Sequence, residues 1–181
     1  MDAWVWIVIA AIGVAIALLI AARLEWGKKR TGRLKEDFGP EYDRAVEDAG
    51  SRRQAESELT DREKRREELD IRPLAPGARD RFADRWRTVQ ERFVDDPTGA
   101  LKEAHVLVVE VMRERGYPTD DFEQRAADVS VDHPHVVENY RSAYAISERD
   151  GADTEDQRQA MVHYRALFDE LLEAEAESAS R

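Results

Sequence analysis

The chain has 181 residues, of which 37% are charged, and its net charge is −11 at neutral pH. It contains no cysteine, which excludes disulfides, thiolate metal sites and cysteine nucleophiles. The negative balance argues against nucleic acid as a partner, because binding to phosphates rests on lysine and arginine. A chain of this length has room for one domain of ordinary size and a further segment.

The first predicted element is a transmembrane helix over Ala3–Ala22, with the sequence AWVWIVIAAIGVAIALLIAA. No charged side chain interrupts this run, and at 1.5 Å per residue it covers roughly 30 Å, the thickness of the hydrocarbon core of a bilayer. A cleaved signal peptide would begin with basic residues, but only Met1 and Asp2 precede the run. We therefore predict an uncleaved anchor over residues 1–26, with the lipid bilayer as its partner.

The residues after the run predict how the anchor is oriented. Basic side chains are concentrated there, at Arg23, Lys28, Lys29 and Arg30. By the positive-inside rule, the chain after the anchor stays cytoplasmic and the N-terminus lies outside. The predicted location is therefore the cell membrane, crossed once, with residues 27–40 as a basic juxtamembrane linker.

A stripe of small residues runs along one face of the predicted anchor. Gly13, Ala17 and Ala21 are spaced four residues apart, and such stripes allow two transmembrane helices to approach closely. They predict a homodimer through this face. The alternative is that the stripe arises by chance, because alanine is common throughout the run.

A densely charged segment follows over residues 41–71. Glu58 and Arg62 have the i, i+4 spacing that supports a helix, but the apolar residues keep no heptad of a coiled coil. The segment is therefore predicted as a solvated, charged helical stalk. Gly50 and Ser51 leave open whether the stalk is one helix or two.

Residues 72–175 are predicted to form a compact cytoplasmic bundle of about five helices. They begin in a segment rich in proline and glycine, and their apolar residues recur at the spacing of helical faces. No segment alternates with period two. The predicted fold class is therefore all-α, with a transmembrane helix, a stalk and a bundle, followed by a disordered tail over residues 176–181.

Local signals predict where the bundle helices begin and end. The first helix is expected over about 76–94. Asp96 before Pro97 predicts the start of the second helix, and Gly116 its end. Asp120 or Asp121 is expected to cap the third helix and Asp132 the fourth. Thr154 and Gln157 have the spacing of a capping box for the last helix.

Four stretches of the part after the anchor look familiar as sequence. They read GPEYDRAVEDAG, RWRTVQERFVDDPTGALKEAHVLVVEVMRERGYP, FEQRAADVSVDHPHVVENYRSAY and TEDQRQAMVHYRALFDELL. They resemble an uncharacterised family of bacterial, membrane-anchored or secreted-type proteins that is frequent in high-GC genomes, a source that suits the arginine-rich composition. The resemblance implies a shared fold and carries no activity.

Candidate sites for chemistry are few. Asp132, His133 and His135 carry ligand atoms for a metal, but residues i and i+2 of a helix point about 200° apart. A cap at Asp132 with Pro134 in the first turn explains the cluster without a metal. No phosphate-binding, dinucleotide-binding or hydrolase motif is present in the sequence. We therefore predict no enzyme activity, no metal site and no cofactor.

His105 and His163 lie beside the apolar faces of two different predicted helices. As a facing pair they could bind an ion or titrate near neutral pH; as single residues, each would be satisfied by a neighbouring carboxylate or carbonyl. A closed apolar cavity beside them would favour a membrane-anchored sensor that binds a small ligand in a helical pocket.

The leading hypothesis is a membrane-tethered cytoplasmic interaction domain, an adaptor or scaffold with a protein partner. Aromatic side chains in a small domain mostly pack in its core, but they can also line a groove for a partner helix. Phe82, Trp86 and Tyr144 are the candidate partner-binding residues. The ligand sensor is the alternative.

Overall fold

The computed structural model describes residues 3–75, 77–149 and 151–178, with side chains described only for part of residues 3–24 and for none after residue 173. Within those ranges the chain forms eight α-helices and no β-strand, which confirms the all-α fold class. In chain order the helices are α1 (Ala3–Phe38), α2 (Pro40–Ala49), α3 (Arg52–Glu68), α4 (Ala78–Arg92), α5 (Pro97–Arg115), α6 (Phe122–Asp132), α7 (Val137–Ser147) and α8 (Thr154–Ser178).

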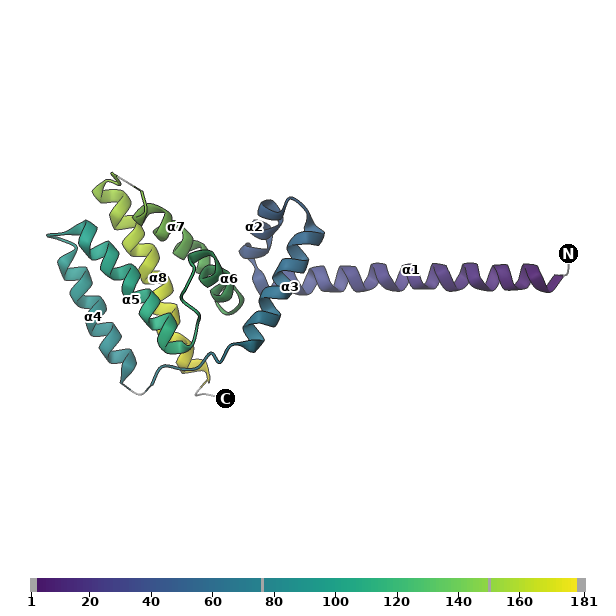
Figure 1. The fold of residues 1–181 in the computed structure, drawn as a ribbon, viewed down its shortest axis with the longest axis horizontal. Coiled ribbons are helices and arrows are strands. Elements are labelled where there is room, and N and C mark those ends of the chain that lie inside the picture. The colour runs from purple at the N-terminus through teal and green to yellow at the C-terminus, as the bar shows by residue number, and fades with distance from the viewer. Residues whose placement is uncertain (1–2, 76, 150, 179–181) are drawn as a thin grey trace.

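Helix α1 projects from the rest of the molecule as a long rod, with the N-terminus at its far end (Figure 1). Among the residues that the structure describes, no helix combines the length and the apolar character needed to cross a membrane. The predicted anchor over Ala3–Ala22 falls largely on side chains outside the described residues, and so do Ala17 and Ala21 of the predicted dimer stripe. The anchor and the homodimer therefore stay predictions.

The predicted basic linker, residues 27–40, is mostly a continuation of α1. The helix runs without a break to Phe38, and Gly39 follows with a φ of +47°. Pro40 then takes the first turn of α2, where its missing N–H leaves no hydrogen bond unmade. Most of the segment predicted as a basic linker is therefore helical.

Residues 41–71, predicted as a charged helical stalk of one helix or two, lie mostly in two helices, α2 and α3, which form a hairpin and divide at Gly50 and Ser51. Gly50, with a φ of +66°, ends α2, and the side chain of Ser51 caps α3 by accepting from the backbone N–H of Gln54 at 3.3 Å. The hairpin and the end of α1 enclose a small apolar core. This hairpin core consists of Leu34, Phe38, Tyr42, Ala45, Ala55 and Leu59. Because each helix supplies only two of these residues, periodicity along one helix does not reveal the core.

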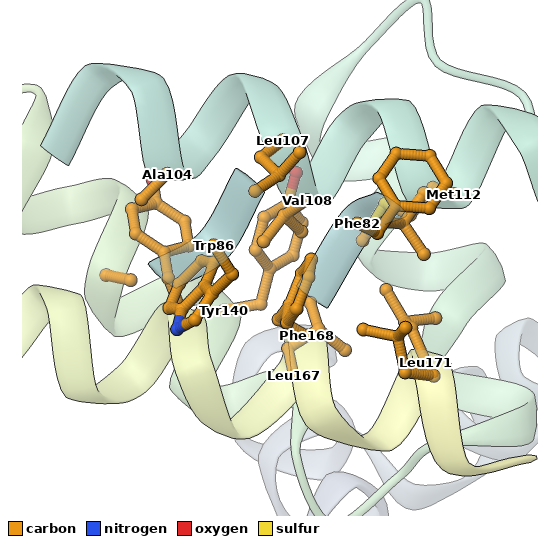
Figure 2. Packing of buried hydrophobic residues seen from close by; sticks show 14 of the residues in the cluster. Phe82, Trp86, Ala104, Leu107, Val108, Met112, Tyr140, Leu167, Phe168 and Leu171 are labelled. Carbon is orange, nitrogen blue, oxygen red and sulfur yellow. The ribbon is translucent and has the colours of Figure 1, made fainter. Parts of the chain in front are cut away.

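Helices α4 to α8 form a bundle around a second and larger apolar core, which we call the bundle core (Figures 1 and 2). Within the bundle, α7 packs on α8, α8 on α5, and α5 on α4. Figure 2 shows this core from close by, with side chains of α5 on one side and side chains of α8 on the other. The site described below lies at the edge of this core, where α4 meets α8.

Three predicted helix ends are confirmed. Asp96 caps α5 by accepting from the backbone N–H of Gly99 at 2.9 Å, and Asp121 caps α6 by accepting from Gln124 at the same distance. Gly116 ends α5 with a φ of +100°. A Cβ at Gly116 would lie 2.3 Å from the carbonyl oxygen of Asp70, so this turn requires glycine for space as well as for conformation.

Two predicted N-caps are wrong. Asp132 is the last residue of α6, because the backbone N–H of His133 still bonds to Val129 at 2.8 Å, and α7 begins only at Val137. At the start of α8, the capping side chain is Asp153, which accepts from the backbone N–H of Asp156 at 2.8 Å. The two residues of the predicted capping box have other roles. Thr154 is the first residue of α8, and the side chain of Gln157 donates to Thr98 at 2.9 Å.

Candidate interaction surface

The three predicted partner-binding aromatic residues lie in different surroundings. Phe82 and Trp86 on α4 are 8% and 4% exposed and belong to the bundle core. Tyr144 on α7 is half-buried and stacks on Phe122, with ring centroids 3.7 Å apart. The structure therefore does not bring the three side chains into one patch. Phe82 and Trp86 each line a groove beside α4.

The groove between α4 and α8 has an aromatic floor. We call it the α4–α8 groove; its volume is about 250 Å³. Trp86 and Phe168 form the floor and stack with ring centroids 4.5 Å apart and an angle of 20° between the planes. The exposed side chains of Arg79, Arg87 and Arg165 stand at its rim. An aromatic floor with cationic edges favours a ligand group that is flat or negatively charged.

Trp86 carries the most unusual polar atom of this groove. Its indole nitrogen, Nε1, is buried and has no hydrogen-bond partner among the described residues. Figure 2 shows this nitrogen at the end of the ring away from α5. Leaving a buried N–H without an acceptor costs about 1–3 kcal/mol, and buried tryptophans usually find a partner for this group. An acceptor placed in the groove would recover that free energy.

The pairs at the rim leave the arginines available. Arg87 pairs with Asp84 at 3.1 Å and Arg165 with Asp169 at 3.2 Å, in both cases within one helix. All four side chains are about half exposed or more, so each pair contributes less than about 1 kcal/mol. A carboxylate arriving from another molecule can therefore compete for these guanidinium groups.

A second groove lies on the other side of α4, against α5. Its volume is about 450 Å³, and Phe82 forms part of its floor. Arg85 pairs with Glu110 and lies over the ring of Phe82, with its guanidinium carbon 5.9 Å from the ring centroid. Arg72, Arg81 and Arg113 complete its basic lining. This groove is more basic than the α4–α8 groove. None of its described lining residues, however, has a buried polar atom without a hydrogen-bond partner, as Trp86 has at Nε1.

The two candidate histidines are held by separate partners. Nδ1 of His105 lies 3.1 Å from the hydroxyl of Tyr164, and Nδ1 of His163 lies 3.0 Å from the amide oxygen of Asn139. Burial, with a smaller contribution from the charge of Arg125, lowers the pKa of His105 to about 4. Neither histidine lines the two grooves described above.

The residues Asp132, His133 and His135, which the sequence places close together, are spread apart in the structure. His133 is buried, with Nδ1 3.3 Å from Glu170, whereas His135 is exposed beside Gly39. Asp132 accepts from Tyr117 and from Arg66, each at 2.5 Å. In the part of the chain that the structure describes, no three His, Asp or Glu side chains are grouped as metal ligands.

A polar joint connects the hairpin to the bundle. Its centre is Glu41 of α2, which is 3% exposed and accepts from Arg62 of α3 at 2.7 Å and from both terminal nitrogens of Arg141 of α7 at 2.6 and 2.8 Å. Burial alone would raise the pKa of the Glu41 carboxyl, but hydrogen bonds and charge from Arg141 and then Arg62 outweigh it, so the pKa lies below its usual range. Glu41 therefore remains ionised at neutral pH.

Further ion pairs extend the joint along both helices of the hairpin. Arg65 donates to the buried Asp128 at 2.9 Å, and Arg44 donates to Glu138 at 2.7 Å. Since the hairpin core also contains the end of α1, the joint fixes the direction of α1 relative to the bundle. Sequence reasoning missed the joint because Glu41 and Arg141 are 100 residues apart and no local pattern links them.

Comparisons with protein-family models, with curated proteins and with solved structures find no match to this chain.

Proposed function

We propose that this protein is a membrane-tethered interaction protein, an adaptor or scaffold that presents its helical bundle to a protein partner on the cytoplasmic side. The observation that carries the proposal is the continuity of α1. One unbroken helix leads from the apolar run Ala3–Ala22 to Leu34 and Phe38, which are fully buried in the hairpin core. A continuous helix would therefore connect an anchor in the membrane to the hairpin, and through the hairpin to the bundle.

The described side chains of the apolar run support a lipid partner. Trp4, Ile16, Leu18 and Leu19 are 53–69% exposed, and exposed apolar side chains gathered on one helix are unfavourable in water. A bilayer would cover them. Between Ala22 and Phe38 the helix would then extend about 24 Å from the hydrocarbon core, which is two to three times the screening length of about 8–10 Å at physiological salt. The acidic bundle would thus be held away from anionic lipid headgroups.

We infer the adaptor role from the high local concentration that a membrane anchor gives to the domain and its partner. A tethered domain raises the effective concentration of its partner at the membrane without needing a catalytic group. The grooves on both sides of α4 provide surfaces for such a partner. The alternative, a sensor with a small-ligand pocket at His105 and His163, gains no support from these grooves because neither histidine lines them.

The test is crosslinking of the tagged full-length chain in its native membrane. We expect the chain in the membrane fraction and a reproducible protein partner that is lost when residues 72–175 are deleted. A matched control replaces Ala3–Ala22 with an unrelated transmembrane segment and should keep the partner, because the anchor is only a tether. A partner that survives deletion of the bundle, or crosslinks only between copies of the chain, contradicts the adaptor role. Recovery of the full-length chain in the soluble fraction contradicts the tether.

A further inference from the structure

We propose that the α4–α8 groove is the docking site of the bundle, and that it binds an acidic segment of a partner protein. In the bound state, a carboxylate oxygen of the partner accepts the N–H of Trp86 while the arginines at the rim neutralise its charge. This inference rests on the proposed adaptor function and names the chemistry of the partner.

The first argument is the unpaired donor. Nearly all buried polar groups in folded proteins have a hydrogen-bond partner, and Trp86 Nε1 has none among the described residues although the side chain is 96% buried. The same side chain lines the α4–α8 groove. A buried donor that has no acceptor, on a side chain that lines a groove, points to an acceptor from outside the chain once the atoms covering the N–H move aside.

The second argument is charge complementarity. Arg79 and Arg87 lie on α4 and Arg165 lies on α8, so cationic side chains flank the Trp86–Phe168 floor from both helices. Two carboxylates also line the groove, Asp169 and the exposed Glu173, so its lining has one more cationic than anionic side chain; Asp169 is already paired with Arg165. Guanidinium groups bind carboxylates with two parallel hydrogen bonds, which makes a carboxylate the acceptor that best satisfies both the floor and the rim.

The third argument concerns size and position. A volume of about 250 Å³ is below the range of about 300–1,000 Å³ typical of small-molecule pockets, and it suits one or two side chains of a docked segment. Figure 1 shows α4 on the side of the bundle away from α1. A partner can therefore reach this groove without meeting the surface to which α1 leads, which favours a protein segment over a lipid headgroup.

One rearrangement is needed for binding. The indole nitrogen is covered in the free protein, so the atoms that cover it must move before a partner can accept its N–H. Arg87 and Gln90 are both exposed residues of α4 and line the groove. Exposed side chains of this kind change rotamer readily, and the stacked floor beneath them can stay in place.

The experiment is an NMR titration of the full chain in lipid nanodiscs, observing the indole N–H signals. The Trp86 signal is assigned with Trp86→Phe, which keeps an aromatic ring against Phe168 and removes the N–H. The probes are a fifteen-residue amphipathic helical peptide with leucine on one face and glutamate beside it, and the same peptide with glutamine for every glutamate. We expect the acidic peptide to move the Trp86 signal downfield and to bind about tenfold more tightly than its glutamine counterpart.

Variants then separate the groove from general charge effects. Trp86→Phe should weaken binding by about tenfold, the equivalent of one hydrogen bond to a charged group, and Arg87→Ala by about threefold. Arg81→Ala is the matched control, because it removes the same charge from the same helix but lies in the other groove. It should leave the affinity unchanged, and circular dichroism should show the same helix content for all four proteins.

Several results would overturn the proposal. A Trp86 signal that stays fixed while the acidic peptide is added contradicts the proposal, and so does equal binding of the two peptides. The proposal is also overturned if phosphatidylglycerol in the nanodisc moves that signal without peptide, which assigns the groove to lipid. A rise in protein concentration alone that moves the signal assigns the groove to a second copy of the chain. Peptide binding with no partner captured at the membrane rejects only the adaptor function. Partner capture that is unchanged by Trp86→Phe rejects only the groove.

Discussion

Helices α5, α7 and α8 pack through a continuous apolar core, whereas the hairpin α2–α3 meets α6 and α7 mainly through arginine–carboxylate pairs. From α6, the partly buried Val131 packs against the hairpin core. Apolar burial is non-directional and roughly proportional to area, but a buried ion pair is favourable only when each charge meets its partner. The bundle core therefore supplies stability, and the polar joint specifies one orientation of α1 relative to the bundle.

The largest effect should come from a cavity in the bundle core. Leu167 is fully buried, so Leu167→Ala should lower the free energy of unfolding by about 4 kcal/mol. Urea unfolding of the full chain in detergent, followed by circular dichroism, measures this change. Val162→Ala on the same helix, at a residue 47% exposed, is the control and should cost less than about 0.5 kcal/mol. Equal effects of the two substitutions would mean that α8 is not held by the apolar core.

The next largest effect should come from the centre of the polar joint. Glu41→Gln keeps the shape of the side chain but leaves Arg62 and Arg141, whose side chains are 14% and 10% exposed, without their shared counter-charge. We expect a loss of about 3 kcal/mol, confined to the hairpin. Hydrogen exchange followed by mass spectrometry should show faster exchange in α2 and α3 with little change in α5 and α8.

The control for this substitution is Glu58→Gln. Glu58 pairs with the same Arg62, but its side chain is 51% exposed, so its removal should change exchange little. Faster exchange throughout the bundle in Glu41→Gln would contradict the separation of the two regions, because it would show that the joint and the bundle core unfold as one unit.

Acid should affect the two regions at different pH values. His105 in the bundle has a folded-state pKa of about 4 because it is buried, below the value of about 6.5 in an unfolded chain. The unfolded state then binds the extra proton, so the stability of the bundle is complete above about pH 6.5 and falls as the pH drops toward 4. We expect a loss of about 1–2 kcal/mol between pH 7.5 and pH 5, and a smaller loss in His105→Gln.

The polar joint should respond to acid in a lower range. The pKa of Glu41 is lowered in the folded protein. The stability that the ionised Glu41 contributes is therefore complete above about pH 4.3, the pKa of the unfolded state, and is lost as the pH falls below that value. Hydrogen exchange at pH 5 should therefore show a loosened bundle and an intact joint. Loosening of α2 and α3 at pH 5, before α5 and α8, would contradict this order.

Local chemistry explains which parts of the fold could be predicted. Asp96 before Pro97 and Gly116 act within one turn of their own helix, so the sequence reveals both ends of α5. Asp132 and Thr154 have the residue types of N-caps, but neither stands at a helix start that it could cap. Asp132 lies one turn before the N-cap position of α7, and Thr154 lies one residue after the N-cap position of α8. Asp153 and Thr154 are both N-cap residue types, so composition alone does not decide between them. Helix α7 begins after Val136, which makes no side-chain cap, so no local residue type marks its start.

The site and the joint depend on contacts between distant segments. Aromatic spacing on α4 singled out Trp86 as a partner-binding candidate, but the spacing could not show that its indole N–H lacks an acceptor, since this depends on Phe168 and the rest of α8. The charged residues of 41–71 indicated a solvated helix because their partners, such as Arg141, lie far along the chain. In this region, high charge density marks an interface between helices.

The smallest effect should come from the edge of the joint. Arg44 pairs with Glu138 at 2.7 Å, and the two side chains are 38% and 56% exposed. Arg44→Ala should therefore cost only about 0.5 kcal/mol, and 1 M salt should remove most of the difference from the original chain, because the screening length falls to about 3 Å. The Glu41→Gln effect should persist in 1 M salt, since buried charges are screened much less. Hydrogen exchange of α2 at low and high salt measures the effects of both substitutions. A Glu41→Gln effect that disappears in 1 M salt would mean that the centre of the joint is open to solvent.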